Sequence, residues 1–127
     1  MKYPEFFERV ESITLKDPLA EFLGAFEEGI ISFSYLDAVK SAGHSCPTIA
    51  GAYLMAREGL KALYKDEVPV RGEIKVFLKE GMEEGTTGVI ANLFSRSTGA
   101  TTTTGFKGLK GHFDRRNLLF FNEVMPL

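Results

Sequence analysis

The chain has 127 residues, 44% of them hydrophobic and 25% charged, which fits one globular domain, residues 1–127, with a core of its own. Its formal net charge of -2 gives no electrostatic case for nucleic-acid binding, and its single cysteine excludes an intrachain disulfide. Because no apolar run approaches the roughly 18 residues of a membrane span, and because the N-terminus lacks an apolar signal segment, we expect a cytoplasmic protein without membrane partners.

The first third of the chain predicts short helices. Residues 4–14 place apolar side chains near helical spacing and predict a first helix. Asp17 followed by Pro18 predicts the start of a second, with Asp17 as N-cap and Gly29 at its end. One face of that helix carries Leu19, Phe22, Leu23 and Phe26. Residues 30–34 fit either a strand or the lead-in to a helix, and residues 34–43 predict a short helix that ends near Gly43.

The remaining elements mix helices and strands. Residues 47–64 predict the longest helix, whose small residues allow another backbone to approach closely. Residues 72–79 alternate and predict a strand with one buried face, Ile74, Val76 and Leu78. A helix from Thr86 or Thr87 to Gly99, a glycine- and threonine-rich loop over 100–117 and a buried strand over 118–124 follow. Since the elements do not alternate regularly, we expect the α+β class with antiparallel sheet.

The stretch "AGHSCPTIAG" over residues 42–51 holds the only cysteine and one of the two histidines. Pro47 favours the first helical position, which places Cys46 at the N-cap, where unpaired N–H groups favour thiolate. His44 and Cys46 can point the same way in extended chain. Thiolate and imidazole suit Zn²⁺ or another divalent metal, and they also form an activated nucleophile with His44 as base. The alternative is a buried Cys46 that only fills space.

Two further groups of residues are candidates for the same site. His112 lies in a second glycine-rich loop and is a candidate third metal ligand, although a ligand can equally come from a second subunit. The same loop gathers positive charge beside glycines that free backbone N–H groups, so it can hold a small anion. The candidate anion-binding residues are Thr101, Lys107, Lys110 and Arg115. The alternative is a solvated loop that offsets the acidic remainder of the chain.

The stretch "GHSCPTIAGAYLMAREGLKAL" resembles the histidine–cysteine motif of the FmdE-like family, which takes its name from one component of formylmethanofuran dehydrogenase. A later segment, "GVIANLFSRSTGATTTTGFKGLKGHFDRRNLLFF", looks like the second motif of that family, but Ala100 stands where the family has a cysteine. The resemblance implies an α+β core that forms an intertwined homodimer. It also implies a core without the C-terminal zinc finger of some members, and a link to one-carbon or molybdenum-enzyme metabolism without a defined activity.

Three functions remain open from the sequence. The first is an FmdE-like metal-binding protein, with zinc as the expected ion and His44, Cys46 and His112 as candidate ligands. The second is a small-ligand-binding or assembly module without catalysis. The third is a metal-free thiol enzyme in which Cys46 and His44 are catalytic and the basic loop holds an anionic substrate.

Overall fold

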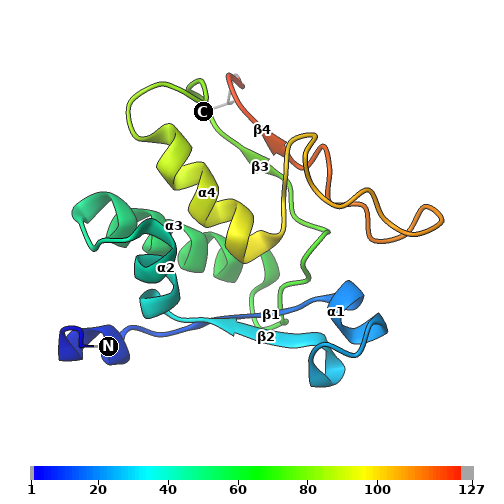
Figure 1. Ribbon diagram of the computed structural model, residues 1–127, viewed down its shortest axis with the longest axis horizontal. Helices are drawn as coiled ribbons and strands as arrows, with labels where there is room; N and C mark the ends of the chain where they lie inside the picture. Colours follow the sequence, from blue (N-terminus) through cyan, green and yellow to red (C-terminus); the bar gives the residue numbers. More distant parts are fainter. Residues whose placement is uncertain (1, 124–127) are drawn as a thin grey trace.

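The computed structural model describes residues 2–123, and three of its helices, α2 to α4, lie between two small sheets, while α1 lies at one end of the lower sheet (Figure 1). The lower sheet pairs β1 (Ile13–Lys16) with β2 (Ile30–Phe33) in antiparallel register. The upper sheet pairs β3 (Val76–Phe77) with β4 (Leu119–Phe120) in parallel. The predicted α+β mixture is therefore confirmed, whereas the expected antiparallel sheet is correct only for β1 and β2.

The predicted helix over residues 4–14 is wrong in its second half. A 3-10 turn, Glu5–Arg9, occupies the start of the range, and Ile13 then opens strand β1. Ile13 and Thr14 are β-branched residues, which favour strands, and β1 pairs with a partner more than a dozen residues downstream. Ile13 and Leu15 point into the core and are 4% and 0% exposed. Ile13 is thus a core residue on a strand, whereas Phe7 reaches the core from the 3-10 turn.

Helix α1 (Pro18–Phe22) begins as predicted but ends seven residues before Gly29. The Asp17 carboxylate accepts hydrogen bonds from the backbone N–H groups of Leu19 and Ala20, at 3.0 and 3.2 Å. A 3-10 turn, Glu27–Gly29, brings the chain back, and the Asp17 N–H donates to the Gly29 carbonyl oxygen. Three side chains of the expected apolar face, Phe22, Leu23 and Phe26, are exposed.

Helices α2 (Tyr35–Ala42) and α3 (Pro47–Tyr64) have the predicted bounds. Ser34 and Asp37 form a capping box at the start of α2, and Gly43 ends the helix in the left-handed region, with φ 84°. Helix α3 packs against both α2 and α4. It supplies a large part of the main core cluster, which comprises Phe7, Ile13, Leu15, Tyr35, Ile49, Tyr53, Ala56, Leu60 and Ile74.

Tyr53 ties helix α3 to the lower part of the fold. Its hydroxyl donates to the carbonyl oxygens of Glu11 and Phe33, at 2.6 and 3.2 Å. Burial raises the pKa of Tyr53 to about 12, because the phenolate would lose its hydration there. The phenol therefore remains a neutral donor to the backbone at physiological pH.

Helix α4 (Thr87–Thr98) ends at Gly99, as predicted, with φ 78°. Strands β3 and β4 are shorter than the ranges 72–79 and 118–124, and Val124 lies outside the described residues. Helix α4 and the loop after it connect β3 to β4, and such a crossover permits parallel pairing. Ala91, Ala100 and Leu119 form a second, smaller core cluster beneath this upper sheet.

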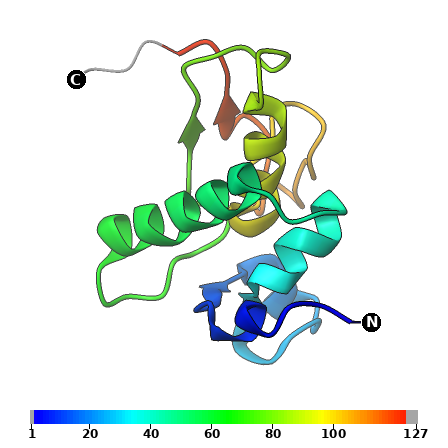
Figure 2. The same cartoon turned by 90° about the vertical axis from the view of Figure 1, so that its left-hand side faces the viewer.

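Helix α3 extends beyond the elements that cover it (Figure 2). Three large apolar side chains on it are exposed: Leu54, Met55 and Leu63. An intertwined homodimer stays a prediction, and these side chains are the ones we expect it to bury. Within residues 2–123, no helix has both the length and the apolar character needed to traverse a bilayer.

Candidate ligand-binding cavity and the His-x-Cys turn

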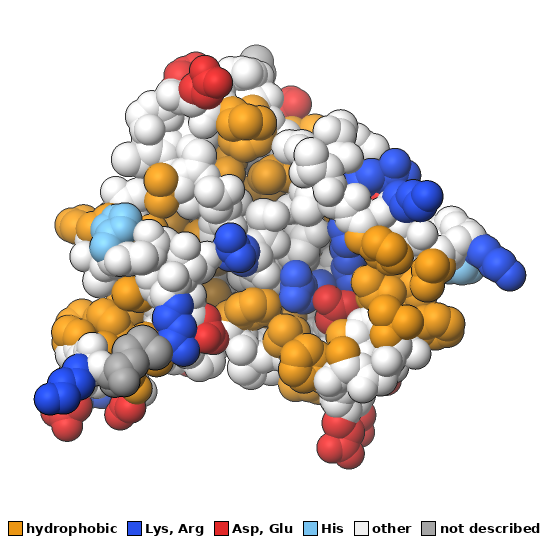
Figure 3. All heavy atoms as spheres, viewed as in Figure 1, with side chains coloured by type: hydrophobic (Ala, Val, Ile, Leu, Met, Phe, Trp, Pro, Cys, Tyr) orange, Lys and Arg blue, Asp and Glu red, His pale blue; other side chains and the backbone are white. Residues whose placement is uncertain are grey.

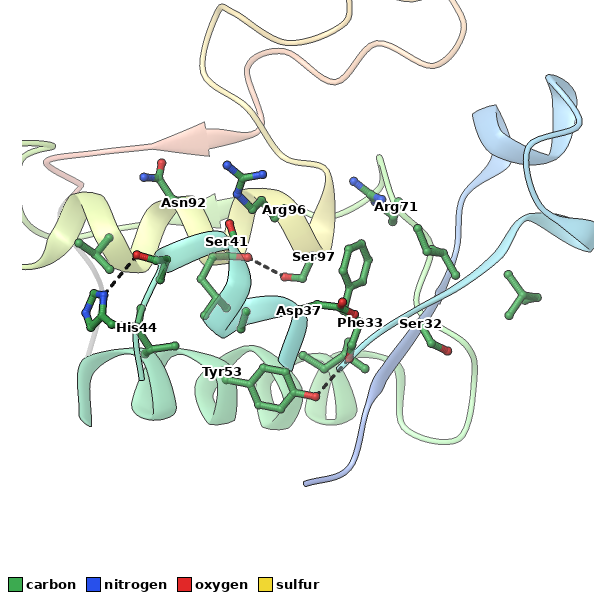
Figure 4. Close-up of a pocket in the computed structure, with 18 of the residues that line it drawn as sticks. Ser32, Phe33, Asp37, Ser41, His44, Tyr53, Arg71, Asn92, Arg96 and Ser97 are labelled. Carbon is green, nitrogen blue, oxygen red and sulfur yellow. Dashed lines mark hydrogen bonds between the residues drawn. The ribbon is translucent and has the colours of Figure 1, made fainter. Parts of the chain in front are cut away.

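A cavity of about 880 Å³ lies between β2, α2, α3 and α4. Its apolar walls come from all of these elements and from β1, and Figure 4 shows Tyr53 and Phe33 on its lower side. In the space-filling view a hollow opens near the centre of one face, with basic side chains around it (Figure 3). The apolar lining residues are Ile13, Phe26, Ile30, Ile31, Phe33, Ala38, Ala42, Ile49, Tyr53, Val89 and Leu93.

Polar side chains converge on the same cavity from three directions. Arg96 and Asn92 come from α4, Ser41 comes from α2, and Arg71 comes from the loop before β3 (Figure 4). Neither Arg96 nor Asn92 has a side-chain hydrogen bond or ion pair with another of residues 2–123, within the usual distance limits. Apolar walls with a few polar groups that have no partner are the usual composition of a small-molecule site.

The sequence analysis did not identify this cavity, although α4 carried a usable signal. Val89, Asn92, Leu93, Arg96 and Ser97 follow the i, i+3, i+4, i+7, i+8 pattern of one helix face. All five line the cavity. Asn92, Arg96 and Ser97 are polar and alternate with two apolar residues on this face. Such a mixed face indicates contact with a ligand or water rather than with a dry core. Arg71 had no comparable local signal.

His44 lies on the turn between α2 and α3, at one end of the cavity (Figure 4). Its side chain is exposed, and its Nδ1 lies 3.2 Å from the carbonyl oxygen of Ala42. Because a carbonyl oxygen only accepts hydrogen bonds, this contact places a proton on Nδ1. Nε2 of a neutral His44 is then free to accept a proton or to bind a metal.

Cys46 is the N-cap of α3, as the sequence predicted, and its side chain is half-buried. The thiol makes no formal capping hydrogen bond. The backbone N–H of Ile49 nevertheless lowers the pKa of Cys46, with smaller contributions from Thr48 and from the His44 side chain, while partial burial opposes them. Cys46 lines a separate apolar groove of about 410 Å³, beside Phe6, Val10, Tyr35, Ser45, Pro47, Ala50, Tyr53 and Leu54.

The structure does not bring His112 to the turn that carries His44 and Cys46. His112 lies in a tight hairpin with Leu109, within the 100–117 loop, on the side of the molecule away from the α2–α3 turn (Figure 1). Among residues 2–123 no three His, Cys, Asp or Glu side chains form a group that could hold a metal ion. Zinc takes three or four protein ligands, so His44 and Cys46 alone would not complete a zinc site.

The four candidate anion-binding residues do not form one cluster. Thr101 donates through its hydroxyl to the Arg115 carbonyl oxygen, at 2.6 Å. The Arg115 side chain is buried and pairs with Asp17. Lys107 and Lys110 lie on the exposed part of the loop. Within this set, the structure places Thr101 next to the backbone of Arg115.

Ala100, the position of the cysteine in the FmdE-like family, is fully buried against Ala91 and Leu119. Its side chain fills the second core cluster, so it is available to neither a metal nor a thiol partner.

Comparisons of the chain with family models, with curated proteins and with solved structures gave no match. The likeness to the FmdE-like family thus rests on the motif residues themselves and stays a prediction.

Proposed function

We propose that this protein binds a small organic molecule in the cavity between β2, α2, α3 and α4. The observation that carries the proposal is the cavity itself, because its volume of about 880 Å³ lies within the range of drug-sized sites. Its walls offer apolar surface to a ligand body, and Arg71, Asn92 and Arg96 offer hydrogen bonds to polar groups. This is the small-ligand-binding function, and no catalytic step is part of the proposal.

A fragment titration tests the proposal. Phenylacetate, phenylacetamide and indole are added in turn to ¹⁵N-labelled protein, and backbone amide shifts are followed by NMR. Fragments of this size bind with Kd values of about 1 mM at best. We expect at least one to shift the amides of residues that line the cavity.

Two exposed helix positions provide a matched pair of variants. Asn92→Phe places a ring in the cavity from α4, whereas Ala62→Phe adds the same ring on α3, outside the cavity. The shifts should persist in Ala62→Phe and disappear in Asn92→Phe. If no fragment shifts the cavity amides, or if Asn92→Phe binds as wild type does, the proposal is wrong.

A second candidate function is metal binding of the FmdE type at His44 and Cys46. The lowered pKa of the Cys46 thiol supports it, because thiolate is the form that binds zinc. The remaining ligand would come from a second subunit of the expected homodimer. Elemental analysis of freshly purified wild type beside Cys46→Ser tests it, with Ser45→Ala as the matched control. Near-stoichiometric zinc in wild type and Ser45→Ala alone supports the candidate, and its absence from all three contradicts it.

A further inference from the structure

One buried carboxylate is surrounded by two guanidinium groups. Arg115 Nη2 lies 2.6 Å from Asp17 Oδ1, and Arg71 Nε lies 3.5 Å from Asp17 Oδ2. Asp17 and Arg115 are 8% and 7% exposed, so both charges are largely removed from water. Within residues 2–123 neither arginine has another acidic partner inside 4 Å. The cluster of Asp17, Arg71 and Arg115 therefore carries one excess positive charge.

Arg71 is the member of the cluster whose bonding is incomplete. Its Nε is buried and has no hydrogen-bond partner among the described residues. Burial is the main cause that lowers the pKa of Arg71, and the positive charge of Arg115 lowers it further, against the opposing effect of Asp17. Charged groups removed from water are normally paired. Arg71 and Arg115 share the single carboxylate of Asp17, so the cluster lacks a second anion among residues 2–123.

The backbone closes two sides of the cluster. A Cβ at Gly99 would lie 3.2 Å from Arg71 Nε, and a Cβ at Gly72 would run into the Arg115 guanidinium. The chain therefore has no room for another side chain at these positions. Arg71 does line the cavity, so an anion can reach it from there.

Within the cavity Arg71 stands above the Phe33 ring, 5.4 Å from its centroid, on the same side as Arg96 (Figure 4). Asp37 and Arg96 both line the cavity and contribute one charge of each sign, without an ion pair between them. The lining residues and the buried cluster together hold three arginines and two aspartates, so the excess remains one positive charge.

We propose that the cavity ligand is a carboxylic acid with a compact apolar body, whose carboxylate pairs with Arg71 and supplies the second anion of the cluster. The inference rests on the proposed small-molecule function. A carboxylate carries the single charge that is missing, and its planar shape suits the guanidinium fork. The apolar body lies against Phe33, Ile49 and Leu93.

The test compares three probes with the same phenyl ring: phenylacetate, its planar neutral amide phenylacetamide, and phenyl phosphate, whose head group is tetrahedral and more highly charged. Affinities are measured by NMR titration at constant pH and ionic strength. We expect wild type to bind phenylacetate about tenfold or more tightly than phenylacetamide, as for a charge-assisted hydrogen bond. Arg71→Gln should remove this preference. It should still fold, since Asp17 retains Arg115.

Arg116→Gln is the matched control, because Arg116 pairs with Asp114 outside the cavity and its loss should leave the preference intact. Arg71→Lys keeps the charge without the planar fork and should retain part of the preference.

Three results would overturn the carboxylate inference. If acid and amide bind equally, and Asn92→Phe blocks both, small-molecule binding stands and the carboxylate inference is wrong. Tightest binding of phenyl phosphate would exclude a single-charge ligand. If neither these probes nor indole binds, both proposals fail.

Discussion

Replacing Asp17 with asparagine is the most informative change to the fold, because it removes a charge and little else. An asparagine oxygen can still accept the N–H bonds at the start of α1. What is lost is the carboxylate that pairs with Arg115 at 2.6 Å and with Arg71 at 3.5 Å. Two guanidinium groups then remain close together without an anion.

Removing one partner from a buried ion pair typically costs about 3 to 5 kcal/mol. For a domain of this size each kcal/mol lowers Tm by about 4 °C, so we expect Asp17→Asn to lower Tm by about 12 to 20 °C. Urea unfolding followed by circular dichroism measures the free energy directly, and calorimetry gives Tm.

Asp114→Asn is the control for this prediction. It is the same chemical change at an exposed ion pair with Arg116, and we expect no measurable loss of stability. The reasoning is refuted if Asp17→Asn unfolds at the wild-type urea midpoint, or if the two variants lose stability equally.

Four other predictions follow from features of the fold and the site. Tyr53→Phe should lower the free energy of unfolding by about 1 kcal/mol in urea titrations, because two backbone carbonyls lose a donor; an unchanged midpoint contradicts this. Gly72→Ala should lower the free energy of unfolding by about 2 to 5 kcal/mol, because strain at φ 94° adds to a clash with the Arg115 guanidinium. Gly43→Ala, with open space around it, should lower it by about 1 kcal/mol; equal losses in the two variants would contradict this reasoning. Cys46 should react with iodoacetamide along a pH profile centred below that of an unstructured cysteine peptide measured alongside; a midpoint at or above that of the peptide counts against the lowered pKa. Sedimentation at micromolar concentration should show a dimer, and a stable monomer would contradict the predicted homodimer.

Local signals in the sequence predicted the central helices well. Pro47 set the start of α3, and Gly43 and Gly99 set the ends of α2 and α4, because a proline or a left-handed glycine acts on its own turn. The same reasoning placed Asp17 at the start of α1. These positions depend on residues within one turn of each other, so the sequence contained the necessary information.

Strand β1 and the contacts between distant residues were not predicted. Strand β1 exists because β2 pairs with it, and the helical spacing of its apolar residues suggested the wrong element. Asp17 was identified only as a cap and Arg115 only as a candidate anion-binding residue. Their pairing joins positions 98 residues apart, which no local pattern indicates. The cavity was missed for the same reason, since five separate elements build its walls.

The separation between Asp17 and Arg115 also matters for the order in which the fold can form. A ribosome synthesises from the N-terminus, so Asp17 emerges 98 residues ahead of the arginine that lies closest to it. Before Arg115 is available, burial of the Asp17 carboxylate is unfavourable. Its lost hydration would be offset only by Arg71, at 3.5 Å, and not by the shorter contact with Arg115. Closing so long a loop carries an entropic cost that is recovered only when the C-terminal segment docks. The buried ion pair thus joins the start of α1 to the loop before β4, two segments near opposite ends of the described chain.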